Sequence, residues 1–135
     1  MISILLYKFQ QLFVNQKEDS PGSDKELCYH YNHTDIFVNS SIFDTASIPS
    51  LEAMKCGAAL VSTYNGGNLD YCLHEENALV SYRFENRLSH DILRLVNDRS
   101  LRNRLALEGE KEAKNWTWER SITTFEKAIN EMLLK

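Results

Sequence analysis

The segment from Asp35 to Gly67, DIFVNSSIFDTASIPSLEAMKCGAALVSTYNGG, constrains the fold of this chain more than any other. It begins with the apolar run Ile36–Val38, which is typical of a strand buried on both faces of a parallel sheet. A polar loop then leads to a predicted helix that starts at Pro49 and ends at Gly57. A second apolar run, Ala59–Val61, predicts another buried strand before a Gly-Gly turn. This order of strand, loop, helix and strand predicts a unit of an α/β fold.

The loop between the first strand and the helix is the predicted ligand site. In an open parallel sheet, ligands bind outside the carboxyl ends of the strands, where helix N-termini provide free backbone N–H groups and a partial positive charge. The loop from Ser40 to Pro49 occupies that position. We therefore expect an anionic ligand such as a diphosphate at this loop.

Composition argues against several other functions. The 135 residues carry a net charge of -4, with 25% charged and 43% hydrophobic residues, as in an ordinary globular chain. No cluster of Lys and Arg is evident, so we expect no nucleic-acid partner. The apolar start, Met1–Val14, is too short to span a bilayer, so we expect no transmembrane segment. Three irregularly spaced cysteines favour a reducing, cytoplasmic location, with attachment to a membrane surface left open.

Residues 1–23 form an unassigned N-terminal segment, and residues 24–135 form the domain. The apolar residues of Met1–Phe13 have the spacing of an amphipathic helix, which is one expectation for this segment. Alternatively, the same residues cover the open edge or face of the sheet, because an exposed edge strand invites pairing with another chain. A homodimer that pairs such edges is the third alternative.

The C-terminal half of the chain predicts a third strand and a helical tail. The strand is expected at Asn77–Ser81, and helical periodicity follows over Leu88–Val96 and Leu101–Asn115. A last helix is expected at Ser121–Leu134, with Trp118 as a packing anchor before it. Its predicted inward stripe is Ile122, Phe125, Ile129 and Met132 or Leu133. The predicted fold class is α/β: a partial Rossmann-like, three-layer fold with a short parallel sheet and a helical C-terminal tail.

These residues together resemble the carboxyl-terminal domain of family 4 glycosyltransferases. Those enzymes have the GT-B fold and move a sugar from a nucleotide-sugar donor. The resemblance covers most of the chain, and its combined pattern is specific although each piece alone is weak. The matching elements are Asp35-Ile36-Phe37-Val38, Ser41, Asp44, Pro49–Gly57, Leu60-Val61, Gly66-Gly67, Glu76–Leu79 and Asn115–Arg120.

The resemblance assigns catalytic-site roles to two acidic residues. It implies that Glu52 binds the ribose hydroxyls of the donor and that Asp44 binds hydroxyls of the transferred sugar. A carboxylate suits both tasks, because it accepts hydrogen bonds from two neighbouring O–H groups at once. Each residue also has an interpretation without a ligand: Glu52 is favoured near a helix start by the dipole, and Asp44 caps a turn.

The rest of the implied nucleotide-sugar site lies in the same loop and in the Gly-Gly turn. The backbone of Ser47–Ser50 would face the phosphates, and Gly66 and Gly67 would approach the donor. The two glycines also have an interpretation as residues that a tight turn requires. The resemblance implies retention of the anomeric configuration, no metal and no cofactor besides the donor itself. The implied binding residues are Thr45, Ser47, Ile48, Pro49, Ser50, Glu52, Gly66 and Gly67.

The resembling enzymes are much longer than this chain. Their acceptor-binding domain, and the Arg and Lys that face the diphosphate, have no counterpart here, so we expect a truncated donor-binding domain. The first functional hypothesis is a donor-domain fragment for sugar transfer in polysaccharide or cell-wall assembly. We expect such a fragment to be inactive alone and to act with a second chain that supplies the N-terminal domain, as half of a split enzyme. The alternative is a non-catalytic remnant or interaction module of the same fold.

Overall fold

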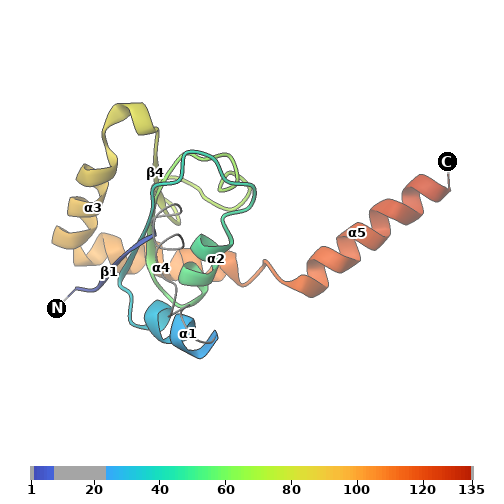
Figure 1. Cartoon of the computed structure of the whole chain (residues 1–135), viewed down its shortest axis with the longest axis horizontal. Helices are drawn as coiled ribbons and strands as arrows, with labels where there is room; N and C mark the ends of the chain where they lie inside the picture. The colour runs from blue at the N-terminus through green and yellow to red at the C-terminus, as the bar shows by residue number, and fades with distance from the viewer. Residues whose placement is uncertain (1, 8–23, 135) are drawn as a thin grey trace, which may run out of the picture.

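Four parallel strands form the centre of the structure (Figure 1). The computed structural model describes residues 2–7 and 24–134. The strands lie in the sheet in the order of the sequence, β1-β2-β3-β4. Their bounds are Ile4–Tyr7 for β1, Ile36–Asn39 for β2, Ala59–Thr63 for β3 and Leu79–Ser81 for β4.

The two central strands are the apolar runs expected from the sequence. Every residue of β2 and of β3 is buried, because helices cover both faces of the sheet. In the register of the sheet, Ile36 of β2 pairs with Ile4 on one side and with Ala59 on the other. The prediction of buried parallel strands at these positions is confirmed.

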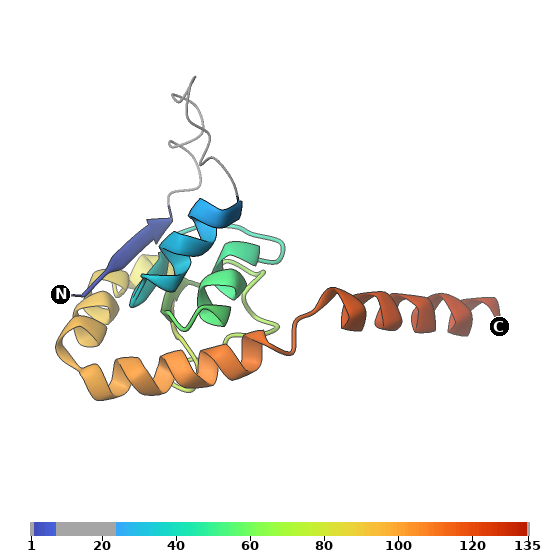
Figure 2. The ribbon, with the colours of Figure 1, turned by 90° about the horizontal axis from the view of Figure 1, so that it is seen from below.

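Helices on both faces of the sheet make three layers (Figures 1 and 2). On one face, α1 (Asp24–Asn32) and α2 (Ile48–Lys55) pack on Phe37 and Leu60. On the other, α3 (Leu88–Asn97) packs on Val38 and Val61 through Leu95. The next helix, α4 (Arg99–Ala113), contributes to both clusters, Leu105 to the second and Ala113 to the first. The predicted three-layer α/β fold is therefore confirmed.

The helix expected at the start of the chain is wrong where the structure describes that segment. Ile4–Tyr7 is strand β1, which pairs in parallel with β2. The carbonyl of Ser3 accepts from the N–H groups of Asp35 and Ile36, so β2 gains partners along its free edge. Pairing an exposed edge outweighs the helical spacing of the apolar residues, which confirms the edge-covering alternative. Residues 8–23 of the predicted segment lie outside the described residues.

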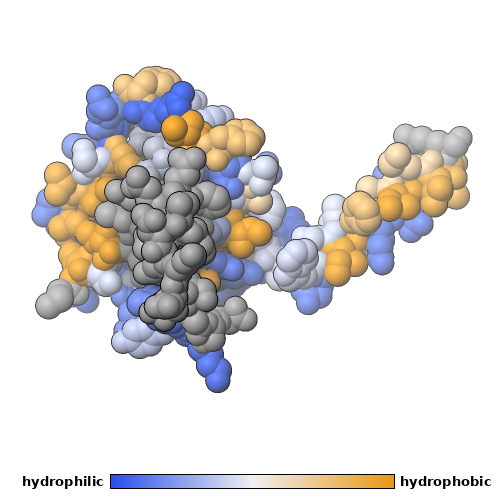
Figure 3. Space-filling view, in the orientation of Figure 1, coloured by the Kyte–Doolittle hydropathy of each residue, from blue (hydrophilic) through white to orange (hydrophobic). Residues whose placement is uncertain are grey.

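The last helix, α5 (Trp118–Leu133), projects away from the domain (Figures 1 and 2). Trp118 is 78% exposed, so its expected role as a packing anchor is wrong. Ile122, Phe125 and Ile129 are 41% to 67% exposed, so the expected inward stripe is wrong too, and its apolar side chains are visible on the helix surface (Figure 3). The spacing correctly placed these residues on one helix face, but no surface of the described domain lies opposite that face.

The connection into β4 is also more structured than expected. Asn77, the first residue of the predicted strand, lies in the loop before β4. Its side chain holds that loop together, since it accepts from Leu73 N at 2.7 Å and donates to Tyr71 O at 2.8 Å. After β4, the expected polar loop contains a short 3-10 helix, η1 (Arg83–Glu85). The strand itself, Leu79–Ser81, is shorter than the predicted Asn77–Ser81.

An ion pair holds the loop before β4 against α3. Arg94 donates to the two carboxylate oxygens of Glu75 at 2.6 and 3.2 Å. This hydrogen-bonded pair holds the pKa of the Glu75 carboxyl below its ordinary value. Glu75 adopts a left-handed backbone conformation, with φ of 66°, so the pair acts at a position that favours glycine.

We expect Glu75→Gln to lower the free energy of unfolding at pH 7 by less than about 1 kcal/mol, because an exposed pair is screened by solvent. The side chain of Glu75 is 42% exposed and that of Arg94 is 30% exposed. Since the folded state lowers the pKa of Glu75, the pair's contribution is full above the unfolded pKa of about 4.3 and is lost as the pH falls below it and through the lower folded pKa. Urea unfolding at pH 7 and pH 3.5 should show the gap between variant and wild type closing. A gap of equal size at both pH values, or the same gap for Glu76→Gln, would contradict this.

Candidate functional site

A buried asparagine at the end of β2 holds the predicted ligand loop. The side-chain amide of Asn39 donates to the hydroxyls of Ser47 and Ser50 at 2.9 and 3.1 Å. Its oxygen accepts from the N–H of Ser41 at 2.9 Å. Because these bonds reach both ends of residues 40–47, they fix the path of the loop from β2 to α2.

Ser47 is the centre of the network that follows. Its hydroxyl donates to Asp44 at 2.7 Å and accepts from the amides of Asn39 and Asn65. Its carbonyl accepts from the hydroxyl of Tyr71 at 3.3 Å, and burial raises the pKa of Tyr71, so this hydroxyl remains a donor. Ser47 has φ of 49° and is buried. The predicted binding residue Ser47 is thus committed to the protein's own hydrogen bonds.

Asp44 caps the turn that precedes α2. Its two carboxylate oxygens accept from the N–H and the hydroxyl of Ser47 at 3.1 and 2.7 Å. Its backbone pairs with Gly66 in an isolated parallel bridge. The interpretation of Asp44 as a cap is confirmed. Since each carboxylate oxygen has two lone pairs, the half-buried side chain can still accept from a ligand, and its contact with a sugar stays a prediction.

The Gly-Gly turn packs against the backbone of the Asp44 loop. Gly66 has φ of 88°, so its place in a tight turn requires glycine. Gly67 is required for a different reason: a Cβ atom there would lie 2.6 Å from the Thr45 carbonyl carbon and 2.7 Å from the Ala46 nitrogen. The sequence indicated a turn, whereas the structure adds a backbone contact that only glycine permits.

The N-terminus of α2 has fewer free donors than expected. The N–H of Ser47 donates to Asp44, and Pro49 has no N–H. The N–H of Ser50 donates back to Ser47 O at 2.9 Å. Ile48 therefore has the single N–H in Ser47–Ser50 without a partner among the residues that the structure describes. Ser50 is fully buried and Thr45 is exposed.

Glu52 lies one turn into α2 and is half-buried. Its carboxylate has no hydrogen bond or ion pair within residues 2–7 and 24–134. Burial, followed by the charges of Cys28 and Glu52, raises the pKa of the nearby Cys56 thiol. Glu52 is thus a half-buried carboxylate with free acceptor capacity.

Sequence reasoning missed the asparagines that join the loop to the sheet. Asn65 donates to Ser47, and the amide nitrogen of the buried Asn68 bonds to Ser62 and Thr63. Asn39 is the last residue of β2, and Asn65 and Asn68 lie in the turn that follows β3. A buried amide at a strand end was the available signal, because such a group must find partners nearby.

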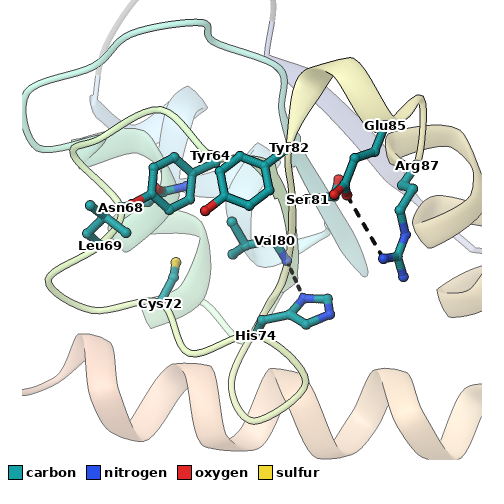
Figure 4. A pocket seen from close by; sticks show the side chains of 10 residues that line it. All are labelled: Tyr64, Asn68, Leu69, Cys72, His74, Val80, Ser81, Tyr82, Glu85 and Arg87. Atoms are coloured by element: carbon teal, nitrogen blue, oxygen red, sulfur yellow. Dashed lines mark hydrogen bonds and ion pairs between the residues drawn. The ribbon is translucent and has the colours of Figure 1, made fainter.

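A pocket of about 300 Å³, which sequence reasoning also missed, opens beside the ends of β3 and β4 (Figure 4). Its lining comes from the turn after β3, the loop before β4, β4 itself and the segment that follows β4. The lining residues are Tyr64, Asn68, Leu69, Cys72, His74, Val80, Ser81, Tyr82, Glu85 and Arg87.

Metal-binding clusters and membrane-spanning helices are both absent from residues 2–7 and 24–134. There, no three His, Cys, Asp or Glu side chains gather in a group that could hold a metal ion. No described helix combines the length and the apolar character needed to cross a membrane. Transfer without a metal stays a prediction.

The chain matches a family model over most of its length. Residues 8–112 match the model described as Glycosyl transferases group 1. The O-antigen chain mannosyltransferase B of Escherichia coli is 29% identical over 100 residues, which cover 74% of this chain. The matched part is 26% of that relative, so the chain spans about a quarter of its length.

Two solved structures resemble the fold. One is the C-terminal domain of a glycosyl transferase group 1 family protein from Francisella tularensis, with a TM-score of 0.65 and 22% identity over 73% of this chain and 51% of that chain. The other, Anabaena HepE in complex with UDP and glucose, has a TM-score of 0.64 and 19% identity over 80% of this chain and 29% of that chain. These likenesses show the fold, which is that of GT-B carboxyl-terminal domains.

Proposed function

The chain belongs to the glycosyl transferases group 1 family, and from this premise we propose that it binds the nucleotide part of a sugar donor. The proposed site lies at the carboxyl edge of the sheet, between the Asp44 loop, Glu52 and the Gly66-Gly67 turn. The observation that carries the proposal is the half-buried Glu52 carboxylate, which has no partner among the described residues. A group with free acceptor capacity in such surroundings is suited to bind ligand hydroxyls.

Each residue has a defined part in this proposal. Glu52 accepts from the ribose hydroxyls, and the free N–H of Ile48 donates to a phosphate oxygen. Asp44 accepts from the transferred sugar while two hydrogen bonds from Ser47 hold its carboxylate in place. A side chain fixed before the ligand arrives loses little freedom on binding, which favours positioning of the reacting groups.

The whole-protein activity that we propose is sugar transfer in polysaccharide assembly. In support, a matching relative is an O-antigen chain mannosyltransferase, and a structural neighbour was solved with UDP and glucose. The proposal includes membership of family 4, retention of configuration, transfer without a metal and a cytoplasmic location. Because the chain spans about a quarter of that relative, we propose that a second polypeptide segment or chain supplies the acceptor side.

A second candidate, a non-catalytic module of the same fold, is favoured by the N-terminus of α2. Three of the four positions in Ser47–Ser50 have no free N–H for a phosphate. Such a helix end binds an anion less well than one with several free donors. Nucleotide binding separates the two candidates.

The test is titration calorimetry of the full chain with UDP, GDP and dTDP. We expect one of them to bind with a Kd below about 1 mM. Glu52→Gln should weaken that binding by about 10-fold or more, since it replaces one acceptor oxygen by a donor and turns the remaining charge-assisted hydrogen bond into a weaker neutral one. The matched control is Glu126→Gln on the exposed α5. Absence of binding for all three nucleotides, or equal affinity of the Glu52→Gln variant and the wild type, would rule out the donor site and leave the module.

A further inference from the structure

Three aromatic rings form a row on the surface beside the pocket. The ring centroids of Tyr64 and Tyr82 are 4.7 Å apart, and those of Tyr82 and Phe84 are 5.3 Å apart. The three side chains are 37%, 45% and 76% exposed. A contiguous exposed apolar surface of this kind commonly marks a binding site. We propose that this aromatic row and the adjoining pocket bind a sugar residue of a neutral acceptor glycan.

The strand ends hold two of the rings in place. Tyr64 directly follows β3, and Tyr82 directly follows β4. The N–H of Tyr64 donates to Ser81 O at 2.9 Å, so the two strand ends are joined where the rings begin. Tyrosine has few side-chain torsions, and a ring positioned by a rigid backbone loses little entropy when a ligand stacks on it.

The pocket supplies the polar contacts that a sugar needs besides an apolar surface. Figure 4 shows the Tyr64 and Tyr82 rings above Val80, with Leu69 and Cys72 to one side and His74 below. The Nδ1 atom of His74 accepts from Val80 N at 3.0 Å, which leaves Nε2 as the donor of a neutral ring. A pyranose has an apolar C–H face and a hydroxyl edge, so it matches this combination.

The charges around the pocket favour a neutral ligand. Glu85 and Arg87 lie together at its far side, with 3.9 Å between their charged groups (Figure 4). The two charges offset each other, so the rim has no excess of cations to attract a phosphate. Both groups can still form hydrogen bonds with hydroxyls. The hydroxyl of Ser81, in the same wall, is buried without a partner among the described residues, which is a further polar group that a bound ligand could satisfy.

The position of the row connects it to sugar transfer. The turn that begins at Tyr64 continues through Asn65, which bonds to Ser47, to Gly66, which pairs with Asp44. The aromatic row and the proposed donor site therefore lie on the two sides of one short turn. That this glycan is the acceptor rests on the proposed function, whereas binding of the glycan does not.

The experiment is saturation-transfer NMR on the full chain without nucleotide. The probes are α-linked mannotriose, maltotriose and chitotriose. We expect at least one to bind, with the strongest transfer to its C–H protons. Tyr82→Ala should reduce the affinity about 10-fold, which is within the effect of losing one stacked ring, and Tyr82→Phe should retain most of it. Tyr29→Ala, which removes an exposed tyrosine on α1, is the matched control.

The outcomes separate this proposal from the donor site. Loss of glycan binding in Tyr82→Ala, with retention in Tyr82→Phe, Tyr29→Ala and Glu52→Gln, supports the aromatic row. Absence of binding for all three trisaccharides, or unchanged binding in a folded Tyr82→Ala variant, overturns it. If the chain binds UMP and Tyr82→Ala abolishes that binding, the proposal is also overturned, because the aromatic row would then bind a nucleobase and not a glycan. Nucleotide titration with Glu52→Gln reports on the donor site independently.

Discussion

Replacement of Gly67 by alanine is expected to lower the free energy of unfolding by about 2 to 3 kcal/mol, at the upper end of overpacking effects. The added methyl group would lie 2.6 to 2.7 Å from backbone atoms of Asp44, Thr45 and Ala46. Backbone atoms cannot move aside as the tip of a flexible side chain can, so the loop and the turn must separate. Urea unfolding followed by circular dichroism measures the loss, and nucleotide binding should disappear with it.

Gly57→Ala is the matched control for this change. Gly57 has φ of 83°, but a Cβ atom there meets nothing within 4 Å. This variant therefore reports the cost of a left-handed alanine alone, about 1 kcal/mol. If Gly67→Ala is no more destabilising than Gly57→Ala, the contact between the Gly-Gly turn and the Asp44 loop is not a rigid one.

Ser47→Ala is the second substitution with a large expected effect, a loss of about 2 to 4 kcal/mol. The hydroxyl accepts from the buried amides of Asn39 and Asn65 and donates to Asp44. Its removal leaves the amide of Asn65 without this partner and frees one oxygen of Asp44. The cost of unsatisfied buried groups exceeds the net value of the bonds themselves. Thermal and urea unfolding should both show the decrease.

Ser47→Gly distinguishes the hydroxyl from the backbone. It removes the same hydrogen bonds, but glycine adopts the φ of 49° found here without strain. We therefore expect Ser47→Gly to be about 1 kcal/mol less destabilised than Ser47→Ala. The reverse order would show that the left-handed conformation is not maintained in solution.

The central sheet could be predicted because its strands are continuous apolar runs. Ile36–Val38 and Ala59–Val61 have no polar position on either face, and only a strand covered on both sides accommodates that pattern. The start of α2 was signalled by Pro49, and its end by Gly57, which has the expected positive φ. Local chemistry was sufficient for these elements.

The errors arose where a distant partner decides the structure. The apolar residues of Ile4–Tyr7 fit a helix or a strand, and only the free edge of β2 selects the strand. The spacing of the apolar residues in α5 places them on one face of the helix, but it does not determine whether another element packs against that face. At the site, the family resemblance assigned Asp44 and the Gly-Gly turn to one binding site, and the structure adds the backbone contact between them. The bonds that occupy Ser47 come from Asn39, Asn65 and Tyr71, and the aromatic row joins two separate loops.

The order of the strands also bears on how quickly the sheet can form. Each strand pairs with its immediate neighbours in the sequence, so every pairing closes one intervening loop and no strand has to enter between two others. The shortest of these loops joins β3 to β4 and the longest joins β1 to β2. A doubling of loop length adds only about 0.6 kcal/mol to the entropic cost of closing the loop. The costs of the three closures therefore differ little, but closure is least costly between β3 and β4 and most costly between β1 and β2. Such winding favours growth of the sheet from β3 and β4 outward, with β1 as the last strand to join in folding and the first to leave in unfolding.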